Sequence, residues 1–194
     1  LLRLLRRLRM QARPGHPQRI LLTSGHRDSG TSATALALAY ASAQSGERTL
    51  LVDAASIDAD LSGVFATGLR QRRTCVLDSK EHLAELVTQD SRTGLAFLPI
   101  ALADLRLLKP ADRMRFSRGL DKLSRDYDVV IIDGGAVLED ETVLGLSTAA
   151  DHILIVARAG TTQRGALAEV LDAMEAVKDR ILGIVLTMGQ PSNP

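Results

Sequence analysis

Short apolar runs rich in Val, Ile and Leu alternate with longer stretches in which apolar residues recur every three or four positions. The short runs predict strands and the longer stretches predict helices. Strands are expected at residues 20–23, 49–53, 95–100, 128–133, 153–157 and 181–187, and helices at 32–45, 81–87, 111–124, 144–149 and 164–177. Strands that alternate with helices and contain unbroken apolar runs are typical of a parallel sheet covered on both faces. The pattern therefore predicts an α/β fold with a doubly wound, mostly parallel sheet and helices on both faces.

The front of the chain carries a separate amphipathic pattern. Leucines recur there at helical spacing and arginines occupy most positions between them: Leu1, Leu4, Leu5 and Leu8, with Arg3, Arg6, Arg7 and Arg9. This pattern predicts a helix, which Pro14 ends. We expect a basic leading helix within residues 1–15 and a single domain over residues 16–194. The helix could pack on the domain with a solvated basic face, form a subunit contact, or lie beside a membrane.

Composition narrows the class of protein. The chain has 194 residues, the size of one domain, and 45% of them are hydrophobic, so disorder is not expected. No apolar run approaches the roughly 18 residues that a membrane-spanning helix needs. Aromatic residues make up only 3% and Trp is absent, which argues against stacking platforms for single-stranded nucleic acid. The one cysteine, Cys75, excludes an internal disulfide and fits a reducing compartment.

The net charge of +1 hides an uneven distribution. Residues 1–27 contain seven arginines and no acid, which leaves 17 basic and 23 acidic residues in the rest of the chain. A basic front therefore precedes an acidic body. No helix-turn-helix pattern accompanies the basic segment, and we expect no specific nucleic-acid partner. Because the chain begins at Leu1 and not at Met, we expect it to be part of a longer protein.

The segment LLTSGHRDSGTS, residues 21–32, combines a strand end, a loop with two glycines and a helix start. In a phosphate-binding loop, GxxxxGK[ST], backbone N–H groups hold the phosphates, the lysine neutralises them and the hydroxyl binds Mg²⁺. Here Thr31 stands at the lysine position, no lysine precedes Lys80, and Asp28 adds a negative charge. The candidate phosphate loop consists of Gly25, His26, Arg27, Asp28, Ser29, Gly30, Thr31 and Ser32.

Two acidic residues are predicted to end strands near this loop. Asp53 closes the run TLLVD, and Asp133 closes VVIID. The carboxyl ends of parallel strands meet at one edge of a sheet, where ligands bind. Since Mg²⁺ prefers carboxylate and hydroxyl oxygens, Ser32, Asp53 and Asp133 are the candidate ligands of a magnesium ion. Each acid taken alone is also compatible with a turn former or a helix cap.

With these motifs in this order, the chain resembles the cytoplasmic domain of bacterial tyrosine kinases, the BY-kinases. These are P-loop relatives of the Min and Par ATPases and are attached to, or fused with, polysaccharide co-polymerases. The resemblance covers almost the whole chain. It includes the arginine-rich leading helix, TSGHRDSGTS at the Walker A position, LLVDAAS at Walker A′, VVIIDGGAV at Walker B, and the closing stretches AADHILIVARAG and ILGIVLTMG.

Each departure from the family pattern falls at a position that handles nucleotide. The resemblance places Asp28 at a family Gly and Thr31 at the essential Lys, while Ser32 keeps the hydroxyl that binds Mg²⁺. Ala55 replaces the second acid of Walker A′, and Thr187 stands where relatives have an Asn that reads adenine. Family kinases end in a tyrosine-rich tail that accepts phosphate, whereas the two tyrosines of this sequence both fall in or beside predicted elements. Truncation would explain a missing tail but would not explain Thr31.

We therefore interpret the chain as a degenerate BY-kinase-like domain. It would be a pseudokinase or pseudo-ATPase with a structural or regulatory role in exopolysaccharide or capsule biosynthesis and export, with vestigial catalytic residues Asp53 and Asp133 and no cofactor. The alternative is an active, ATP-dependent tyrosine autokinase that uses ATP or ADP with Mg²⁺, its lysine replaced by Arg27 or by an arginine of a neighbouring subunit. The second alternative is a Min/Par-type positioning ATPase, which would also need a loop lysine.

The resemblance also implies partners. These are a membrane polysaccharide co-polymerase or a transmembrane part of the same protein, at the inner face of the bacterial membrane, and a homo-oligomer or a kinase partner. The domain itself would be cytoplasmic. Family members form rings through a Glu-x-x-Arg-x-x-Arg stretch. Arg3 and Arg6 match its arginines, whereas its Glu would precede Leu1, so we expect weak ring formation or none.

Overall fold

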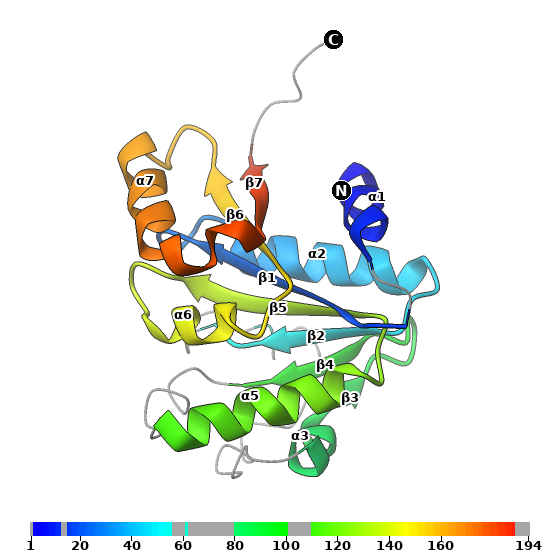
Figure 1. Cartoon of the computed structure of the whole chain (residues 1–194). Coiled ribbons are helices and arrows are strands. Elements are labelled where there is room, and N and C mark those ends of the chain that lie inside the picture. Colours follow the sequence, from blue (N-terminus) through cyan, green and yellow to red (C-terminus); the bar gives the residue numbers. More distant parts are fainter. Residues whose placement is uncertain (1, 13–14, 56–60, 62–79, 101–109, 189–194) are drawn as a thin grey trace.

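The computed structural model of the chain describes residues 2–12, 15–55, 61, 80–100 and 110–188. Helices and strands alternate along it, as Figure 1 shows. The described helices are α1 (Leu2–Gln11), α2 (Thr31–Gln44), α3 (Lys80–Leu86), α5 (Pro110–Ser124), α6 (Thr142–Ser147), α7 (Arg164–Ala173) and the 3₁₀ helix η3 (Glu175–Arg180). The strands are β1 (Gln18–Ser24), β2 (Thr49–Asp53), β3 (Thr88–Gln89), β4 (Ala96–Pro99), β5 (Val129–Ala136), β6 (His152–Arg158) and β7 (Ile181–Thr187). None of these helices is long and apolar enough to span a membrane.

The strands form one sheet in the order β3-β4-β2-β5-β1-β6-β7. Every neighbouring pair is parallel except β3 with β4. The predicted α/β fold with a doubly wound, mostly parallel sheet is therefore confirmed. From β1 the chain builds toward β2 on one side and later adds β6 and β7 on the other. The carboxyl ends of β1 and β5 thus lie at the point where the strand order reverses, which is where such sheets bind ligands.

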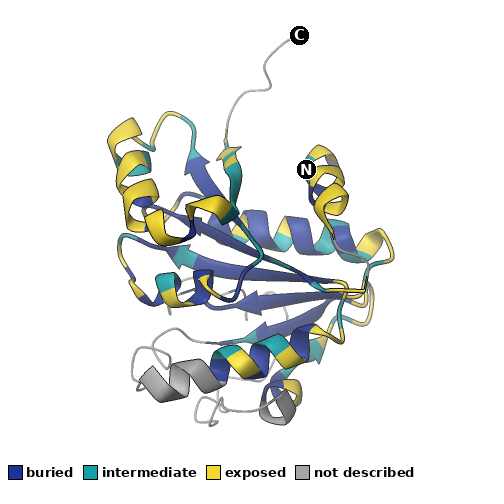
Figure 2. Cartoon of the chain, viewed as in Figure 1, coloured by how far each residue is buried: buried dark blue, intermediate teal, exposed yellow. Residues whose placement is uncertain are grey.

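Apolar side chains bury two clusters, one on each face of the sheet. Helices α3, α5, α6 and α7 cover one face with residues such as Phe116, Leu120 and Val170. Helices α1 and α2 cover the other face with residues such as Leu8 and Leu38. Figure 2 shows the central strands buried between these layers. Since both faces are covered, the strands have the near-continuous apolar runs from which the sequence predicted them.

Helix α1 packs on α2 through its leucines. Leu5 and Leu8 are only 5% and 2% exposed and share an apolar cluster with α2. The Gln18 side chain donates to the Leu8 carbonyl at 2.7 Å, and Arg9 pairs with Glu47 at 2.8 Å. The arginines on the outer side are exposed: Arg3, Arg6 and Arg7. The structure therefore shows packing on the domain with a solvated basic face, while the subunit contact and the membrane-proximal role stay predictions.

The predicted end of the central strand was wrong. Strand β5 does not stop at Asp133 but continues to Ala136. At Gly134 the strand passes so close to β1 that an added Cβ would lie 2.7 Å from Leu21 Cδ1 and 3.2 Å from the Leu22 carbonyl oxygen. The absence of a side chain at Gly134 therefore allows the two strands to lie together.

Most other predicted boundaries differ from the structure by one or two residues, and two differences are larger. The helix expected over residues 164–177 ends at Ala173, and the 3₁₀ helix η3 follows from Glu175 with a kink inside it at Val177, whose φ is −130°. Strand β3 was not predicted because two residues, both polar, carry no apolar periodicity. Cys75 lies outside the described residues.

Candidate functional site

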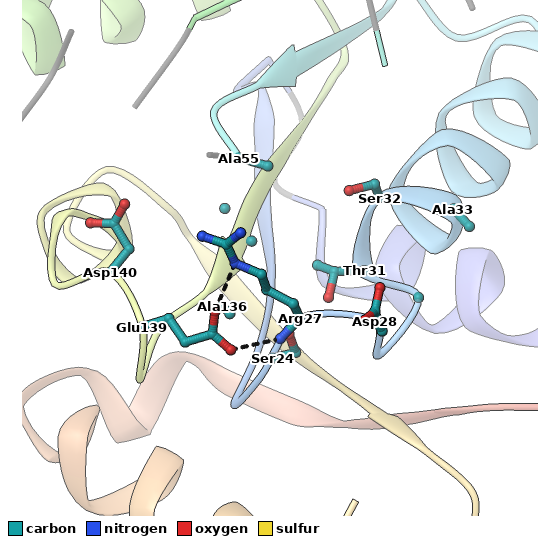
Figure 3. Close-up of a pocket in the computed structure, with 13 residues that line it drawn as sticks. Ser24, Arg27, Asp28, Thr31, Ser32, Ala33, Ala55, Ala136, Glu139 and Asp140 are labelled. Carbon is teal, nitrogen blue, oxygen red and sulfur yellow. Dashed lines mark hydrogen bonds and ion pairs between the residues drawn. The ribbon is translucent and has the colours of Figure 1, made fainter. Parts of the chain in front are cut away.

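A pocket of about 290 Å³ opens at the carboxyl end of the sheet, at the reversal of strand order. Three segments enclose it: the loop between β1 and α2, the residues after β2, and the end of β5 with the turn that follows (Figure 3). The lining residues are Ser24, Arg27, Asp28, Gly30, Thr31, Ser32, Ala33, Ala55, Gly134, Gly135, Ala136, Glu139 and Asp140. We call it the loop pocket. The structure thus gathers five residues of the candidate phosphate loop with segments from the Walker A′ and Walker B positions.

The candidate phosphate loop is held together by its own hydrogen bonds. The Ser24 and Ser29 hydroxyls both donate to the His26 carbonyl, at 2.9 and 2.7 Å. Asp28 has a φ of 60° and Gly30 a φ of 84°, both in the left-handed region that favours glycine. Position 28, where the family has a glycine, therefore keeps a backbone conformation suited to glycine although an acid occupies it.

Helix α2 begins at Thr31, directly after this loop. Its first turn contains no acidic residue, and no side chain caps its first N–H groups. The amino end of a helix carries partial positive charge and favours anions. Thr31 is 7% exposed, so the side chain at the lysine position is buried, short and uncharged. Ser32, beside it, is partly exposed and lines the loop pocket (Figure 3).

Asp53 and Asp133 lie side by side because they are direct partners in the parallel register of β2 and β5. Asp133 is 0% exposed, and its Oδ2 has no hydrogen-bond partner among the described residues. Burial raises the pKa of Asp133 to about 6, although hydrogen bonds from the Ser32 hydroxyl and the Gly135 N–H act in the opposite direction. The Gly135 N–H lies 3.3 Å from Asp133 Oδ1. The site therefore holds a carboxyl group that is costly to ionise.

The polar side chains in and beside the loop pocket are better suited to bind a magnesium ion than to bind a triphosphate. A protein-bound Mg²⁺ keeps several waters and needs only one or two carboxylates. The Ser32 hydroxyl and Asp133 Oδ2 could therefore supply its protein ligands. A bound dication would also favour the ionised form of Asp133. No group of three or more His, Cys, Asp or Glu side chains that could hold a metal occurs in the described part of the chain. A triphosphate fits poorly because Asp28 lines the pocket and no lysine is present at position 31.

Glu139, on the turn after β5, is a pocket residue that the sequence did not single out. Its carboxylate accepts a hydrogen bond from the Arg27 backbone N–H at 3.0 Å and pairs with Arg27 Nε at 2.8 Å (Figure 3). His26 Nδ1 lies 3.6 Å from the same carboxylate. Arg27, the cation expected to replace the lysine in an active kinase, is therefore paired with an acid. The two residues are 112 positions apart, and no local pattern connects them.

Thr187, predicted on the adenine side, contacts the back of the candidate phosphate loop. Its hydroxyl donates to the Ser29 carbonyl at 2.8 Å and lies 3.3 Å from the Ala157 carbonyl. Arg158 Nη1 donates to the Asp28 carbonyl at 3.2 Å. The ends of β6 and β7 therefore hold the loop by its backbone carbonyls, and the Thr187 hydroxyl is committed to that contact.

The other predicted site residues lie outside the pocket lining. Gly25 is buried, and a Cβ there would be 3.1 Å from Val170 Cγ2, so close packing against α7 explains this glycine. Asp53 ends β2 and Asp133 lies beside it within β5, and neither residue is among the pocket-lining residues. Arg3 and Arg6 are on the exposed side of α1 and take no part in it.

The sheet, with a glycine-containing loop that leads into a helix at the reversal of strand order, defines a P-loop NTPase-like fold. The chain belongs to the AAA domain family, whose model matches residues 25–186. It is similar to the tyrosine-protein kinase CpsD of Streptococcus agalactiae, with 26% identity over 174 residues that cover 89% of this chain and 76% of that protein. The resemblance to bacterial tyrosine kinases is thereby confirmed.

Other relatives are named for different functions. The succinoglycan biosynthesis transport protein ExoP of Rhizobium meliloti is 26% identical over 174 residues, which cover 86% of this chain but 22% of that protein. The chromosome partitioning protein ParA of Caulobacter vibrioides is 29% identical over 194 residues, which cover 89% of this chain and 70% of that protein. The relatives that this chain matches therefore include kinases, a transport protein and a partitioning protein.

Solved structures agree on the fold. The VpsO kinase domain matches with a TM-score of 0.74 at 23% identity, over 90% of this chain and 86% of that chain. The kinase domain of the Escherichia coli tyrosine kinase ETK matches with a TM-score of 0.75 at 19% identity, over 100% and 76%. Cobyrinic acid a,c-diamide synthase from Mycobacterium smegmatis, with a bound ATP analog and magnesium, matches with a TM-score of 0.72 at 20% identity, over 91% and 77%.

Proposed function

We propose that this chain is a BY-kinase-like domain that has lost phosphoryl transfer and acts as a structural or regulatory module in exopolysaccharide or capsule biosynthesis and export. The observation that carries the proposal is the buried, uncharged Thr31 at the position of the loop lysine. Similarity to the kinase CpsD and to the biosynthesis transport protein ExoP supports the assignment to this pathway class.

The charge of the loop pocket supports the loss of nucleotide binding. Asp28, Glu139 and Asp140 line it, whereas Arg27 is the one basic residue among the described lining residues. At an effective dielectric of about 20, a like-charge contact at about 4 Å costs on the order of 4 kcal/mol before relaxation. A polyphosphate would meet this repulsion without the lysine that normally offsets it.

Two observations bear on the alternatives. Asp133 Oδ2 has no hydrogen-bond partner within the part of the chain that the structure describes, and with the Ser32 hydroxyl it preserves a place for Mg²⁺. This favours the active-kinase alternative with ATP or ADP. The Arg27–Glu139 ion pair argues against it, because Arg27 would have to leave an acid in order to neutralise a phosphate. Similarity to ParA keeps the Min/Par-type positioning ATPase as the second alternative, and it needs the same missing lysine.

Titration calorimetry with Mg-ATP and Mg-ADP tests the proposal. We expect no measurable binding at micromolar nucleotide. Micromolar affinity in the unaltered chain would overturn the pseudoenzyme function and support the kinase.

A loop-repair variant tests whether the missing side chains are the cause. Thr31→Lys combined with Asp28→Gly should restore measurable binding of Mg-ATP, since the backbone at position 28 already suits glycine. Ala37→Lys combined with Asp28→Gly is the matched control, because Ala37 is exposed on α2, outside the pocket lining. Equal gains in both variants would show that the loss of Asp28 or the added charge, and not a lysine at position 31, restores binding. No gain in either would locate the defect in the shape of the loop.

The partners expected from the family belong to the same proposal. We place the domain in the cytoplasm at the inner face of the membrane, beside a polysaccharide co-polymerase, where it can associate with further copies or with an active kinase. The exposed Arg3 and Arg6 on α1 would contribute to such contacts. Multi-angle light scattering at micromolar concentration should show weak self-association or none, and a discrete ring would contradict this expectation.

A further inference from the structure

The candidate phosphate loop binds the Glu139 carboxylate in the way that such a loop binds a phosphate anion. One of its oxygens accepts the Arg27 backbone N–H at 3.0 Å, and the other lies 2.8 Å from Arg27 Nε. Combining a backbone N–H with a cationic side chain on one anion is the chemistry by which such loops hold phosphate. Both residues line the loop pocket, and Figure 3 shows the Arg27 side chain extended across it beside Glu139.

The position of Glu139 depends on the fold of the opposite loop. Glu139 lies on the turn between β5 and α6, where its N–H bonds to the Ala136 carbonyl at 3.2 Å. Asp140 follows it and fixes the start of α6, since its carboxylate accepts the Thr142 N–H at 3.0 Å and the Thr142 hydroxyl at 2.7 Å. These hydrogen bonds fix the backbone of the turn, so the Glu139 side chain extends from a fixed backbone position to the candidate phosphate loop.

We propose that Glu139 is an internal anion that occupies Arg27 and keeps phosphate-bearing ligands out of the loop pocket. This inference rests on the proposed function in that it takes residues 25–32 as a phosphate loop. A ligand with a phosphate or pyrophosphate group must displace the Glu139 carboxylate from Arg27. Before it does so, the negative charge of Glu139 repels it. The ion pair thus acts as an autoinhibitory contact between two loops.

The partial exposure of both side chains means that the contact can open. Arg27 is 53% and Glu139 34% exposed, so water screens the pair and its stability is modest. Removing the carboxylate takes this ion-pair partner from the Arg27 guanidinium and also eliminates one negative charge from the pocket wall. These two effects act in the same direction, and we expect at least a tenfold gain in affinity for a small polyanion at low ionic strength.

The test measures the binding of inorganic pyrophosphate by titration calorimetry at low ionic strength. Glu139→Gln should bind it at least tenfold more tightly than the unaltered chain. Glu141→Gln is the matched control, because Glu141 is an exposed acid two residues away that does not line the pocket. The gain should disappear in the double variant Arg27→Gln with Glu139→Gln. An unchanged affinity in Glu139→Gln, an equal gain in Glu141→Gln, or a gain that survives without Arg27 would each overturn the proposal.

A second measurement keeps the proposal testable if Glu139→Gln does not fold. The Arg27 Nε resonance of the unaltered chain should shift when pyrophosphate is added at millimolar concentration, since the guanidinium changes partner. Saturation of the other shifted signals without a change at Arg27 Nε would overturn the proposal. Micromolar Mg-ATP binding by the unaltered chain would defeat the proposed function and would also show that Glu139 does not exclude phosphate. An unchanged pyrophosphate affinity in Glu139→Gln, without Mg-ATP binding by the unaltered chain, would overturn the role of Glu139 alone.

Discussion

Replacing Asp133 by Asn is expected to stabilise the fold at neutral pH, although it removes the acid that the motif preserves. Burial raises the pKa of Asp133 from 3.8 to about 6. One pKa unit corresponds to about 1.4 kcal/mol, so the ionised carboxyl costs the folded state roughly 3 kcal/mol above pH 6. Asn has the same shape and no charge, but its buried amide hydrogens need acceptors, which offsets about 1–2 kcal/mol of the gain. The expected net stabilisation is about 1–2 kcal/mol.

The raised pKa of Asp133 also predicts how the stability difference between the Asn variant and the unaltered chain changes with pH. A raised carboxyl pKa means that the folded state binds the proton more tightly than the unfolded chain does. The cost of ionising Asp133 is therefore absent below pH 3.8, develops between pH 3.8 and about 6, and is complete above that. The advantage of Asp133→Asn over the unaltered chain should be largest near pH 8 and should fall by roughly 2–3 kcal/mol toward pH 4.

Urea denaturation followed by circular dichroism, at several pH values with EDTA present, measures the difference between the two chains. EDTA is needed because a divalent cation would stabilise the ionised carboxylate and mask the effect. A difference in the free energy of unfolding that does not change with pH would refute the reasoning. So would an Asn variant that is less stable than the unaltered chain at pH 8.

Three further substitutions test the packing and the charges of the described residues. Burial alone would raise the pKa of Asp151, but Arg19 holds that pKa below its ordinary value. Asp151→Asn should therefore destabilise the fold at neutral pH, and the destabilisation should disappear as the pH falls below 3.8. Leu8→Ala should lower the free energy of unfolding by about 2–4 kcal/mol and weaken the amide protection of α1, because Leu8 is 2% exposed. Gly134→Ala should cost about 1–3 kcal/mol in a thermal melt, since its Cβ would lie 2.7 Å from Leu21 Cδ1.

Matched controls separate these effects from general ones. Asp172→Asn removes an exposed acid and should change stability little at any pH. Met10→Ala alters the same helix as Leu8 at a position that is 86% exposed, and Gly145→Ala adds a Cβ where no atom lies within 4 Å. If Met10→Ala costs as much as Leu8→Ala, then α1 does not pack as described. If Gly145→Ala costs as much as Gly134→Ala, then the close approach of β1 and β5 is not the cause.

Much of the fold could be read from the sequence because the buried strands are apolar on both sides. The predicted strand at residues 49–53 coincides with β2, and the last predicted strand coincides with β7. Two of the errors fell where apolar periodicity carries no information: in β3, which has two polar residues, and in the two glycines of β5. Glycine is a strand breaker by propensity, and only contact with β1 explains why the strand continues.

The sequence by itself determined the order of the elements, the loop at residues 25–32, and the absence of a lysine from it. Those properties depend on residue type and spacing along the chain. Only the tertiary structure decided which charges meet: Asp133 beside Asp53 through the strand register, and Arg27 against Glu139 across two loops. Electrostatic interactions depend on distance and burial, which arise when segments far apart in sequence fold together. The lack of a loop lysine could therefore be predicted from the sequence, whereas the pairing of Arg27 with the Glu139 carboxylate could not.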